Sequence, residues 1–548
     1  MTHTLNSMNK SVLASSIALA LMALPAAVIA QERPEAGQIQ QQSQSRELAP
    51  LTPSVELDLD AGVLTAAEIG GARVQLNAIR LQGNQVFSAE QLLAQLGDFQ
   101  GQEYDLAGLQ ALANQISQFY REQGYVFASA LLPVQDLANG ELKIHVIEGR
   151  YGQVKTQGDL AAATQRFVSP LQPGDVIESS LLERQLMIMG DLPGVAVVPV
   201  MRPGEHLGTG NLDVQVSETQ RITGRVSVDN HGSRFSGAYR GRGDLQVNRL
   251  LTVGDELSVS ALYTSEETWL GSLSYALPLM ANGLRGSLSY SHTDYTLGEG
   301  FEGYTGTAGI FATGLSYPLL RSQTSNLRLN GTLQYKDLDD TADISNYKKA
   351  TESYSLPLAL LFDHRDALGR GGITWGSLSA TPGQMKTSTS QTGSTVTDDE
   401  SFLLVNLEVV RLQALADKLS LYGRFNSQWA NHEQLDGSES FSIGGPNGVR
   451  AFPVGEGSDS RGWLTQFELR YQLARGVSPY ILLDAGRTLK GGTDEAAREL
   501  AAAGVGARYN HKGFSADLVS AWELDGGDAQ ADDRQQNPRF WFNASYSF

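Results

Sequence analysis

The chain of 548 residues contains no cysteine. This absence excludes a disulfide scaffold and thiolate metal sites, and it suits an envelope protein that stays unfolded while it crosses a periplasm. Basic residues are also in short supply, because 41 Lys and Arg face 60 Asp and Glu, which leaves a net charge of −19. A balance this acidic argues against nucleic acid as a partner.

Groups of residues with the spacing of a catalytic or metal site are scarce as well. There is no Walker-type phosphate loop, so ATP is not expected as the energy source. The eight histidines are scattered without metal-ligand spacing, and neither a metal nor a cofactor is expected. One cluster, Asp363-His364-Arg365-Asp366, combines an acid, a base and a cation. No nucleophile or second ligand is near it in sequence, so we interpret it as a structural turn and do not expect an enzyme.

Long apolar runs are missing beyond the N-terminus. Residues 1–30 carry Lys10, an apolar run from Val12 to Ile29 and small residues before Gln31. This pattern predicts a secretory signal peptide, since the run is short for a membrane anchor and no stop-transfer flank follows. The mean hydropathy of −0.21 is too polar for a bundle of membrane helices. A β-barrel, whose strands are half polar, is hidden in such an average.

The segment 31–71 is rich in Gln, Ser, Glu and Pro. This composition favours an extended, disordered linker. A helix over Gln31–Leu48 is the alternative, but Pro34 and the lack of an apolar stripe argue against it.

From residue 220 to Phe548 apolar and polar residues alternate almost without interruption, which predicts strands with one apolar and one polar face. Sixteen candidate strands begin near residues 221, 237, 255, 268, 282, 304, 325, 352, 372, 400, 418, 462, 477, 501, 514 and 539. Their even number fits an outer-membrane barrel. Every second connection is short, and most of the others are long and polar, including Lys336–Glu352 and Pro382–Asp399. Short turns face the periplasm, so the N-terminal region is expected there.

One stretch, Gly444–Trp463, interrupts the alternation with Gly, Pro and a single central arginine, Arg450. It is too broken by turn residues to be a strand or helix. In the next strand but one, Asp484 of YILLDAG lies on the polar face. If that face lines a barrel, an inward-folded loop brings Arg450 to Asp484, and Glu468 on the intervening strand is a second candidate partner.

The VRAF tetrad with its Gly-rich flanks, and LLDAG one strand later, resemble the VRG(F/Y) loop and the (F/G)xDxG strand motif of the outer-membrane insertase and two-partner secretion superfamily. The resemblance implies a loop folded into the barrel and locked to its wall by Arg450 and Asp484. The expected loop residues are Gly444, Gly445, Val449, Ala451 and Phe452. Ala451 stands where the family usually has Gly, and Leu482 where it has Phe or Gly. Neither change removes a charge.

The N-terminal half carries two similar α+β patterns, 72–149 and 150–219. The first has a strand at Val74–Leu81, a helix capped by Ser88, a longer helix from Asp105 and two strands. This order resembles a polypeptide-transport-associated (POTRA) domain, and the second unit repeats it. A short sheet backed by helices has open edges that can add a strand from an extended client. The alternative is that the two units are only spacers.

The last strand ends in alternating aromatic residues, of which Phe548 is the final one. A terminal aromatic residue resembles the signal by which the barrel-assembly machinery recognises its substrates. Because lipid cannot satisfy bare backbone groups, this strand is expected to pair with the first, near Arg221–Asn230.

The sequence therefore predicts a transmembrane β-barrel of 16 antiparallel strands, preceded by two periplasmic α+β POTRA domains. Two such units before a barrel resemble the two-partner secretion arrangement, in which a helix such as Gln31–Leu48 often plugs the barrel. This resemblance implies export of a large partner exoprotein, of the adhesin or cytolysin type, across the outer membrane by a monomer. An insertase that releases clients sideways into the membrane is the alternative. A diffusion porin explains neither the N-terminal domains nor the VRAF loop.

Overall fold

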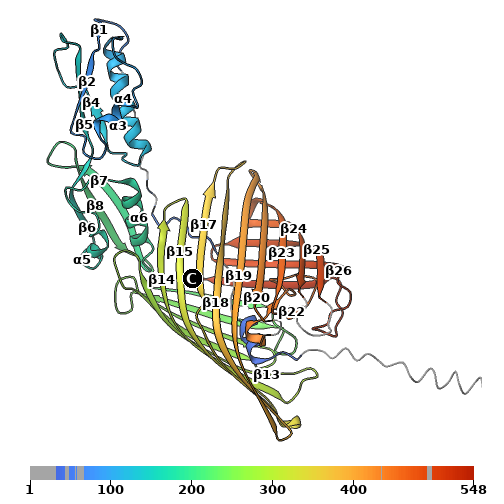
Figure 1. The fold of residues 1–548 in the computed structure, drawn as a ribbon. Coiled ribbons are helices and arrows are strands. Elements are labelled where there is room, and N and C mark those ends of the chain that lie inside the picture. The colour runs from blue at the N-terminus through green and yellow to red at the C-terminus, as the bar shows by residue number, and fades with distance from the viewer. Residues whose placement is uncertain (1–32, 44–48, 56, 58–66, 433–434, 490–496) are drawn as a thin grey trace, which may run out of the picture.

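The computed structural model describes residues 33–43, 49–55, 57, 67–432, 435–489 and 497–548. Two small α+β domains stand at one end of a large β-barrel (Figure 1). The expected signal peptide, residues 1–30, lies outside the described residues. Within the described part of the chain, no helix is both long and apolar enough to span a membrane.

The first α+β domain contains two small sheets and two helices. Its elements are β1 (Val74–Gln75), β2 (Ala78–Gln82), α3 (Ala89–Leu93), β3 (Glu103–Tyr104), α4 (Leu106–Glu122), β4 (Ser129–Leu131) and β5 (Glu141–Ile147). Ser88 caps α3 in a capping box with Gln91, and Asp105 caps α4. One face of α4 packs on the β2-β5-β4 sheet in a separate apolar core. The two helix starts agree with the sequence prediction.

The second domain repeats the plan with an added short helix. It consists of β6 (Arg150–Gln157), α5 (Ala161–Thr164), η1 (Gln165–Val168), α6 (Ser179–Gly190), β7 (Val195–Pro203) and β8 (Thr209–Glu218). The sheet order is β6-β8-β7. Its core also takes in Val55 from the segment that precedes both domains. Helix α6 faces the barrel. Gly283 lies in a barrel turn, and a Cβ placed on it would be 3.3 Å from Ile188 of α6.

The barrel closes completely. Its strands are β9 (Ile222–Asp229), β10 (Arg240–Asn248), β11 (Glu256–Thr264), β12 (Trp269–Pro278), β13 (Arg285–Thr296), β14 (Tyr304–Arg321), β15 (Ser325–Ala342), β16 (Tyr347–Ser355), β17 (Leu358–Asp366), β18 (Gly372–Gln391), β19 (Ser394–Ala416), β20 (Leu419–Ala430), β23 (Gly462–Tyr471), β24 (Val477–Thr488), β25 (Glu499–His511), β26 (Phe514–Asp525) and β27 (Arg539–Ser547).

Segments β16 and β17 are two parts of one barrel strand. Both pair with β15 on one side and with β18 on the other. Leu356 and Pro357 separate them, because proline has no N–H to donate to a neighbouring strand. The wall therefore has sixteen antiparallel strands, as the sequence predicts.

The prediction of long polar loops is wrong at two of the connections. Strands β18 and β19 pair as far as Gln391 and Ser394, so Pro382–Asp399 is mostly a β-hairpin. Strands β15 and β16 likewise continue to Ala342 and Tyr347. The first extension is rich in Thr and Ser and the second in Asp and Lys, so both strands are polar on both faces and give no alternating apolar signal.

The two faces of the wall differ as expected. Large apolar side chains are exposed on the outside, among them Leu273, Tyr290, Phe311, Leu333, Phe467 and Leu518. Charged pairs such as Arg424–Glu408 and Arg242–Asp244 line the inside. This arrangement places the apolar band against lipid and makes the lumen polar.

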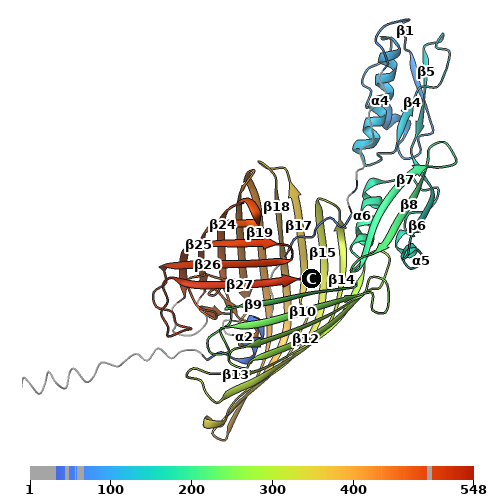
Figure 2. The ribbon, with the colours of Figure 1, turned by 180° about the vertical axis from the view of Figure 1, so that it is seen from behind.

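A short helix, α2 (Ala36–Ser43), lies inside the barrel (Figure 2). The preference for an extended linker does not hold for these residues. Their helix has no continuous apolar stripe, because only Ala36 and Ile39 pack on an apolar cluster, which includes Phe235, Tyr295 and Leu338. Its Gln side chains find hydrogen-bond partners among polar groups of the lumen. Gln40, for example, donates to Ser291 at 3.1 Å.

Candidate functional site: the loop and helix inside the barrel

The chain between β20 and β23 folds back into the barrel, in agreement with the sequence prediction. It forms η3 (Gly437–Glu439) and a small hairpin of β21 (Phe441–Ser442) and β22 (Ser458–Asp459), whose tip carries the VRAF tetrad. The tip is buried against the inner wall in an apolar cluster of Phe441, Ile443, Val449, Ala451, Phe452, Leu464, Leu500, Ala502 and Ala521.

The glycines at the start of the tip have a geometric role. A Cβ on Gly444 would lie 2.5 Å from Glu456 Cβ, and Gly445 has a φ of +99°. Ala451, the departure from the family pattern, does not belong to the residues with positive φ. Its Cβ is therefore tolerated, and the side chain adds to the apolar cluster.

Arg450 reaches both predicted acids. Its Nε and Nη2 donate to the two oxygens of Asp484 at 2.8 and 2.6 Å, and its Nη1 donates to Glu468 Oε1 at 2.5 Å. The backbone N–H of Arg450 also donates to Asp484, at 3.2 Å. Arg450 is 4% exposed and Asp484 0%. We call Arg450, Asp484 and Glu468 the loop lock. Its bidentate geometry is the strong form of an arginine–carboxylate pair.

Glu468 is shared more widely than the sequence indicated. Arg470 and Arg508 also donate to it, at 2.8 and 2.9 Å, and Arg508 continues to Asp517 at 3.1 Å. Sequence reasoning missed both arginines. The alternation of side chains along a strand predicts that both arginines point inward. Which inward side chains meet on neighbouring strands depends on the pairing register, and the alternation does not determine that register.

Further contacts hold the main chain of the tip. Trp541 on the last strand donates from Nε1 to the Arg450 carbonyl at 2.7 Å, and Gln466 donates to the Gly448 carbonyl at 2.9 Å. Leu482, the second departure from the family pattern, packs with Trp541 in an inward apolar cluster. The tip therefore has one well-defined seat on the wall formed by β23, β24 and β27.

Helix α2 occupies another part of the lumen and contacts the same loop. A Cβ on Gly37 would lie 2.4 Å from Ser438 Cβ, so the helix and η3 pack backbone to backbone. Lys349 binds Glu35 just before the helix and Asp436 just before η3, at 2.6 and 2.7 Å. One barrel lysine therefore ties both occupants to the wall.

Both ends of α2 are satisfied by wall residues. Asp340 accepts the N–H of Ala36 at 2.9 Å, where the helix dipole favours a negative charge. At the other end, Arg240 and Arg242 donate to the carbonyls of Gln42 and Ser43 at 2.9 and 3.2 Å. Beside the helix a cavity of about 480 Å³ is left in the lumen, lined by the helix, the loop and the wall.

The barrel seam lies between β27 and β9, as expected from the sequence. Five residue pairs join the strands, from Asn543↔Asp229 to Ser547↔Arg225. Phe548, the predicted assembly signal, exchanges two backbone hydrogen bonds with Gly224, at 2.9 and 3.0 Å, and the residue is 55% exposed. The same residue thus closes the end of the seam that carries the chain terminus.

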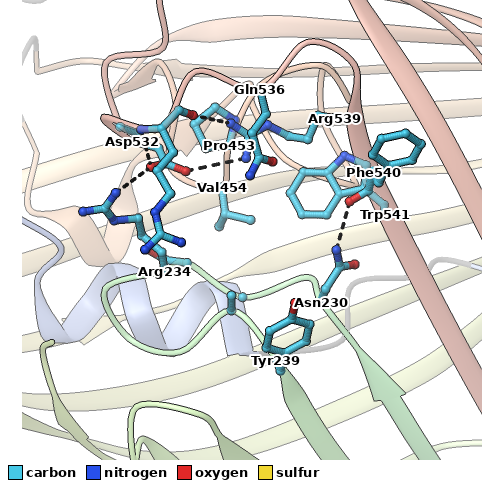
Figure 3. Close-up of a pocket in the computed structure, with 15 residues that line it drawn as sticks. Asn230, Arg234, Tyr239, Pro453, Val454, Asp532, Gln536, Arg539, Phe540 and Trp541 are labelled. Carbon is cyan, nitrogen blue, oxygen red and sulfur yellow. Dashed lines mark hydrogen bonds and ion pairs between the residues drawn. The ribbon is translucent and has the colours of Figure 1, made fainter. Parts of the chain in front are cut away.

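At the opposite end of the seam, Asn230 takes the place of a longer strand. Its side chain donates to the Phe540 carbonyl at 2.9 Å (Figure 3). It also accepts from the Phe542 N–H at 2.8 Å. Next to it is a cavity of about 150 Å³, bordered by Arg234, Tyr239, Val454 and Trp541. The nearby guanidinium of Arg234 is paired with Asp532 at 3.1 Å.

Comparison with known proteins decides the family. Residues 208–509, more than half of the chain, match the model described as haemolysin secretion/activation protein ShlB/FhaC/HecB. The chain belongs to this family. Residues 74–149 match the ShlB-type POTRA domain.

Relatives of this family align over most of the chain. The heme/hemopexin transporter protein HuxB of Haemophilus influenzae is 27% identical over 483 residues, 84% of each chain. The outer membrane transporter CdiB of Escherichia coli is 25% identical over 79% of this chain and 76% of the relative. Solved structures of CdiB from Escherichia coli and Acinetobacter baumannii superpose over all of both chains with TM-scores of 0.71 and 0.65, at 21% and 19% identity. The two structures share its fold.

The family assignment settles the general function. The protein is an outer-membrane transporter of the two-partner secretion type, which exports a partner exoprotein and has its POTRA domains in the periplasm. The export function and the location were both predicted from the sequence.

Proposed function

We propose that this transporter exports a large exoprotein of the adhesin or cytolysin type through the barrel lumen, after the α2 helix and the loop tip have moved aside. The observation that carries the proposal is that two segments fill one polar lumen and hold each other there. Each is bound by side chains of the wall, and Lys349 and the packing of Gly37 on Ser438 join them. An extended polypeptide needs the space that they occupy.

Client capture belongs to the POTRA domains. The two three-stranded POTRA sheets have four edges, and three of these are blocked among the described residues. Pro199 and Pro203 remove N–H groups from β7, the Gln165 side chain bonds to β6, and Ser117 accepts the N–H of Ala130 on β4. Strand β2 pairs only with β5, and its register points the N–H groups of Ile79 and Leu81 to the open side. We infer that an extended client segment adds to this edge.

Energy for transport comes from the client in this proposal. A chain that folds on the outer side cannot slide back, so export needs no ATP hydrolysis by the transporter and no catalytic group. The wall is closed within one chain, which supports a monomer surrounded by lipid. The exposure of Phe548 beside the seam supports recognition by the barrel-assembly machinery during insertion.

The test is Arg450→Ala in the full-length transporter, expressed together with its partner exoprotein. The variant should give a heat-modifiable barrel in the outer membrane, but secretion should fall at least about tenfold, because two buried carboxylates lose their shared cation. Arg487→Ala is the matched control, since Arg487 pairs with Glu499 in an exposed ion pair of the same barrel. Secretion by Arg450→Ala equal to that of the control would remove the loop lock from the mechanism.

A further inference from the structure

Residues 49–55 and 57, which follow α2 in the sequence, pass through a narrow junction. On one side are two barrel turns at the end that faces the POTRA domains, and on the other is helix α6 of the second POTRA domain (Figures 1 and 2). This segment has no regular secondary structure, yet side chains from three different elements bind its backbone.

Arg321, the last residue of β14, is the centre of the junction. Its Nε and Nη2 form a bidentate pair with Asp191, the C-cap of α6, at 2.7 Å each. The same Nη2 lies 3.2 Å from the Thr52 carbonyl and 3.3 Å from Ser54 Oγ. The residue is 2% exposed. A single buried charge therefore binds the barrel, the POTRA domain and this segment together.

Other residues extend the grip along the segment. Asp363 accepts the N–H of Leu51 at 3.3 Å and Arg365 donates to its carbonyl at 2.8 Å. The Gln323 side chain binds both the N–H and the carbonyl of Leu57, at 3.3 and 3.2 Å. The Asp363-His364-Arg365-Asp366 cluster, interpreted from the sequence as a structural turn, thus supplies two of the residues that hold the segment.

The POTRA side of the junction is closely fitted. Ser54 donates to the Met187 carbonyl of α6 at 3.0 Å, and Val55 is buried in the core of this domain. A Cβ on Gly190 would lie 2.6 Å from Val55 Cγ2 and 2.8 Å from Ser54 Oγ. The end of α6 therefore allows the segment to pass only because residue 190 has no side chain.

We propose that residues 51–55 and 57, held by Arg321, Gln323, Asp363, Arg365 and the end of α6, form a linker clamp through which the second POTRA domain controls α2. Arg321 is its positioning residue, because Asp191 and the linker share its donors. A movement of α6 that draws Asp191 away leaves the buried guanidinium half paired, which disfavours the clamped state. The linker and then α2 become free to move. This inference rests on the proposed function, in which α2 must leave the lumen.

The first experiment measures channel opening of the full-length protein in planar lipid bilayers. Arg321→Gln removes the shared charge, and Gly190→Ala pushes the linker away while keeping a good helix former in α6. Both should raise the open probability about tenfold or more. The matched control is Arg411→Gln, because Arg411 forms a bidentate pair with Asp366 at a neighbouring turn, at 2.6 and 3.0 Å, and its hydrogen bonds do not reach the described linker residues. Openings at the wild-type level in both clamp variants would overturn the proposal.

The second experiment fixes the clamp in place. Because the chain has no cysteine, the pair Ser54→Cys and Gly190→Cys gives a single possible disulfide. Their Cβ positions, 3.0 Å apart, need a shift of under about 1 Å to form it. Oxidised cells should lose at least about nine-tenths of secretion and regain it on mild reduction. Equal secretion in the oxidised and reduced states would overturn the clamp.

A deletion separates this inference from the function on which it rests. Removal of residues 33–43 should open the channel if α2 blocks the lumen. If the deletion leaves the channel closed, the proposed function itself is wrong. If the deletion opens the channel and both clamp variants stay closed, only the linker clamp is wrong.

Discussion

One guanidinium, that of Arg450, is the partner of two buried carboxylates, and this sets the energetics of the loop. Asp484 accepts two hydrogen bonds from this guanidinium and a third from the backbone N–H of Arg450, and Glu468 accepts one from the guanidinium. Removing Arg450 costs more than the set contributes, because Asp484 stays desolvated without its cation, whereas Glu468 keeps Arg470 and Arg508. The residues of the loop lock should therefore behave non-additively.

A double-variant cycle measures this behaviour. Arg450→Ala should lower the free energy of unfolding of the barrel in lipid vesicles by about 3 kcal/mol or more. Adding Asp484→Ala should recover part of that loss, because it removes a carboxylate that has no exposed surface. Urea titration followed by tryptophan fluorescence gives the three values. Losses that simply add would mean that the two side chains are not coupled.

Outside the membrane, Asp105 offers a pH-dependent test at the same scale. Hydrogen bonds from the N–H groups of Gly108 and Gly70 hold the pKa of this helix cap below its ordinary value. A carboxyl with a lowered folded pKa stabilises the domain above its unfolded pKa, and the stabilisation disappears as the pH falls through the folded value. Asp105→Asn should remove this acid dependence from the unfolding of residues 67–149, which include Gly70 and the core of the first POTRA domain. An unchanged pH profile would exclude the cap as its source.

At the scale of elements, the edges of the POTRA sheets make a prediction that needs no substitution. When an extended N-terminal fragment of the exoprotein is added, the amides of Ile79 and Leu81 on β2 should gain protection from hydrogen exchange, because they become strand donors. The amides of β7 serve as the internal reference, since Pro199 and Pro203 interrupt that edge. Protection of β7 amides instead of β2 amides would mean that the client binds the second POTRA domain, and the proposed β2 site would be wrong.

The same scale explains which elements the sequence predicts. The two-residue period identifies the wall strands because each has lipid on one side and the lumen on the other. Thr and Ser around residues 382–399 continue the strand beyond the lipid, where the period is lost. The sequence of helix α2 lacks the apolar periodicity of a typical helix, because Gln40 and Gln41 bind polar groups in the lumen. Arg450 and Asp484 can be predicted because each lies in a recognisable sequence motif. The contacts of Arg470 and Arg508 with Glu468 depend on the register of the strands, which the sequence does not show.

At the scale of the whole molecule, two exits are conceivable for a client, the lumen and the seam between β27 and β9. The lumen is held shut by removable parts, namely α2 and the loop tip. The seam is closed by backbone pairing, by the Phe548–Gly224 exchange and by the Asn230 side chain. The secretion route uses the first exit, and lateral release into the membrane uses the second.

A disulfide across the seam decides between the two exits. Ser227 and Ser545 face each other in the register of β9 and β27, and Cα atoms in such antiparallel pairs lie within the range that a disulfide bridges. With Ser227→Cys and Ser545→Cys, the oxidised protein should secrete its partner at the wild-type rate, because the client passes through the lumen. The reduced protein is the control for the substitutions themselves. Secretion that stops on oxidation and returns on reduction would require the seam to open, and would favour the sideways route over the lumen.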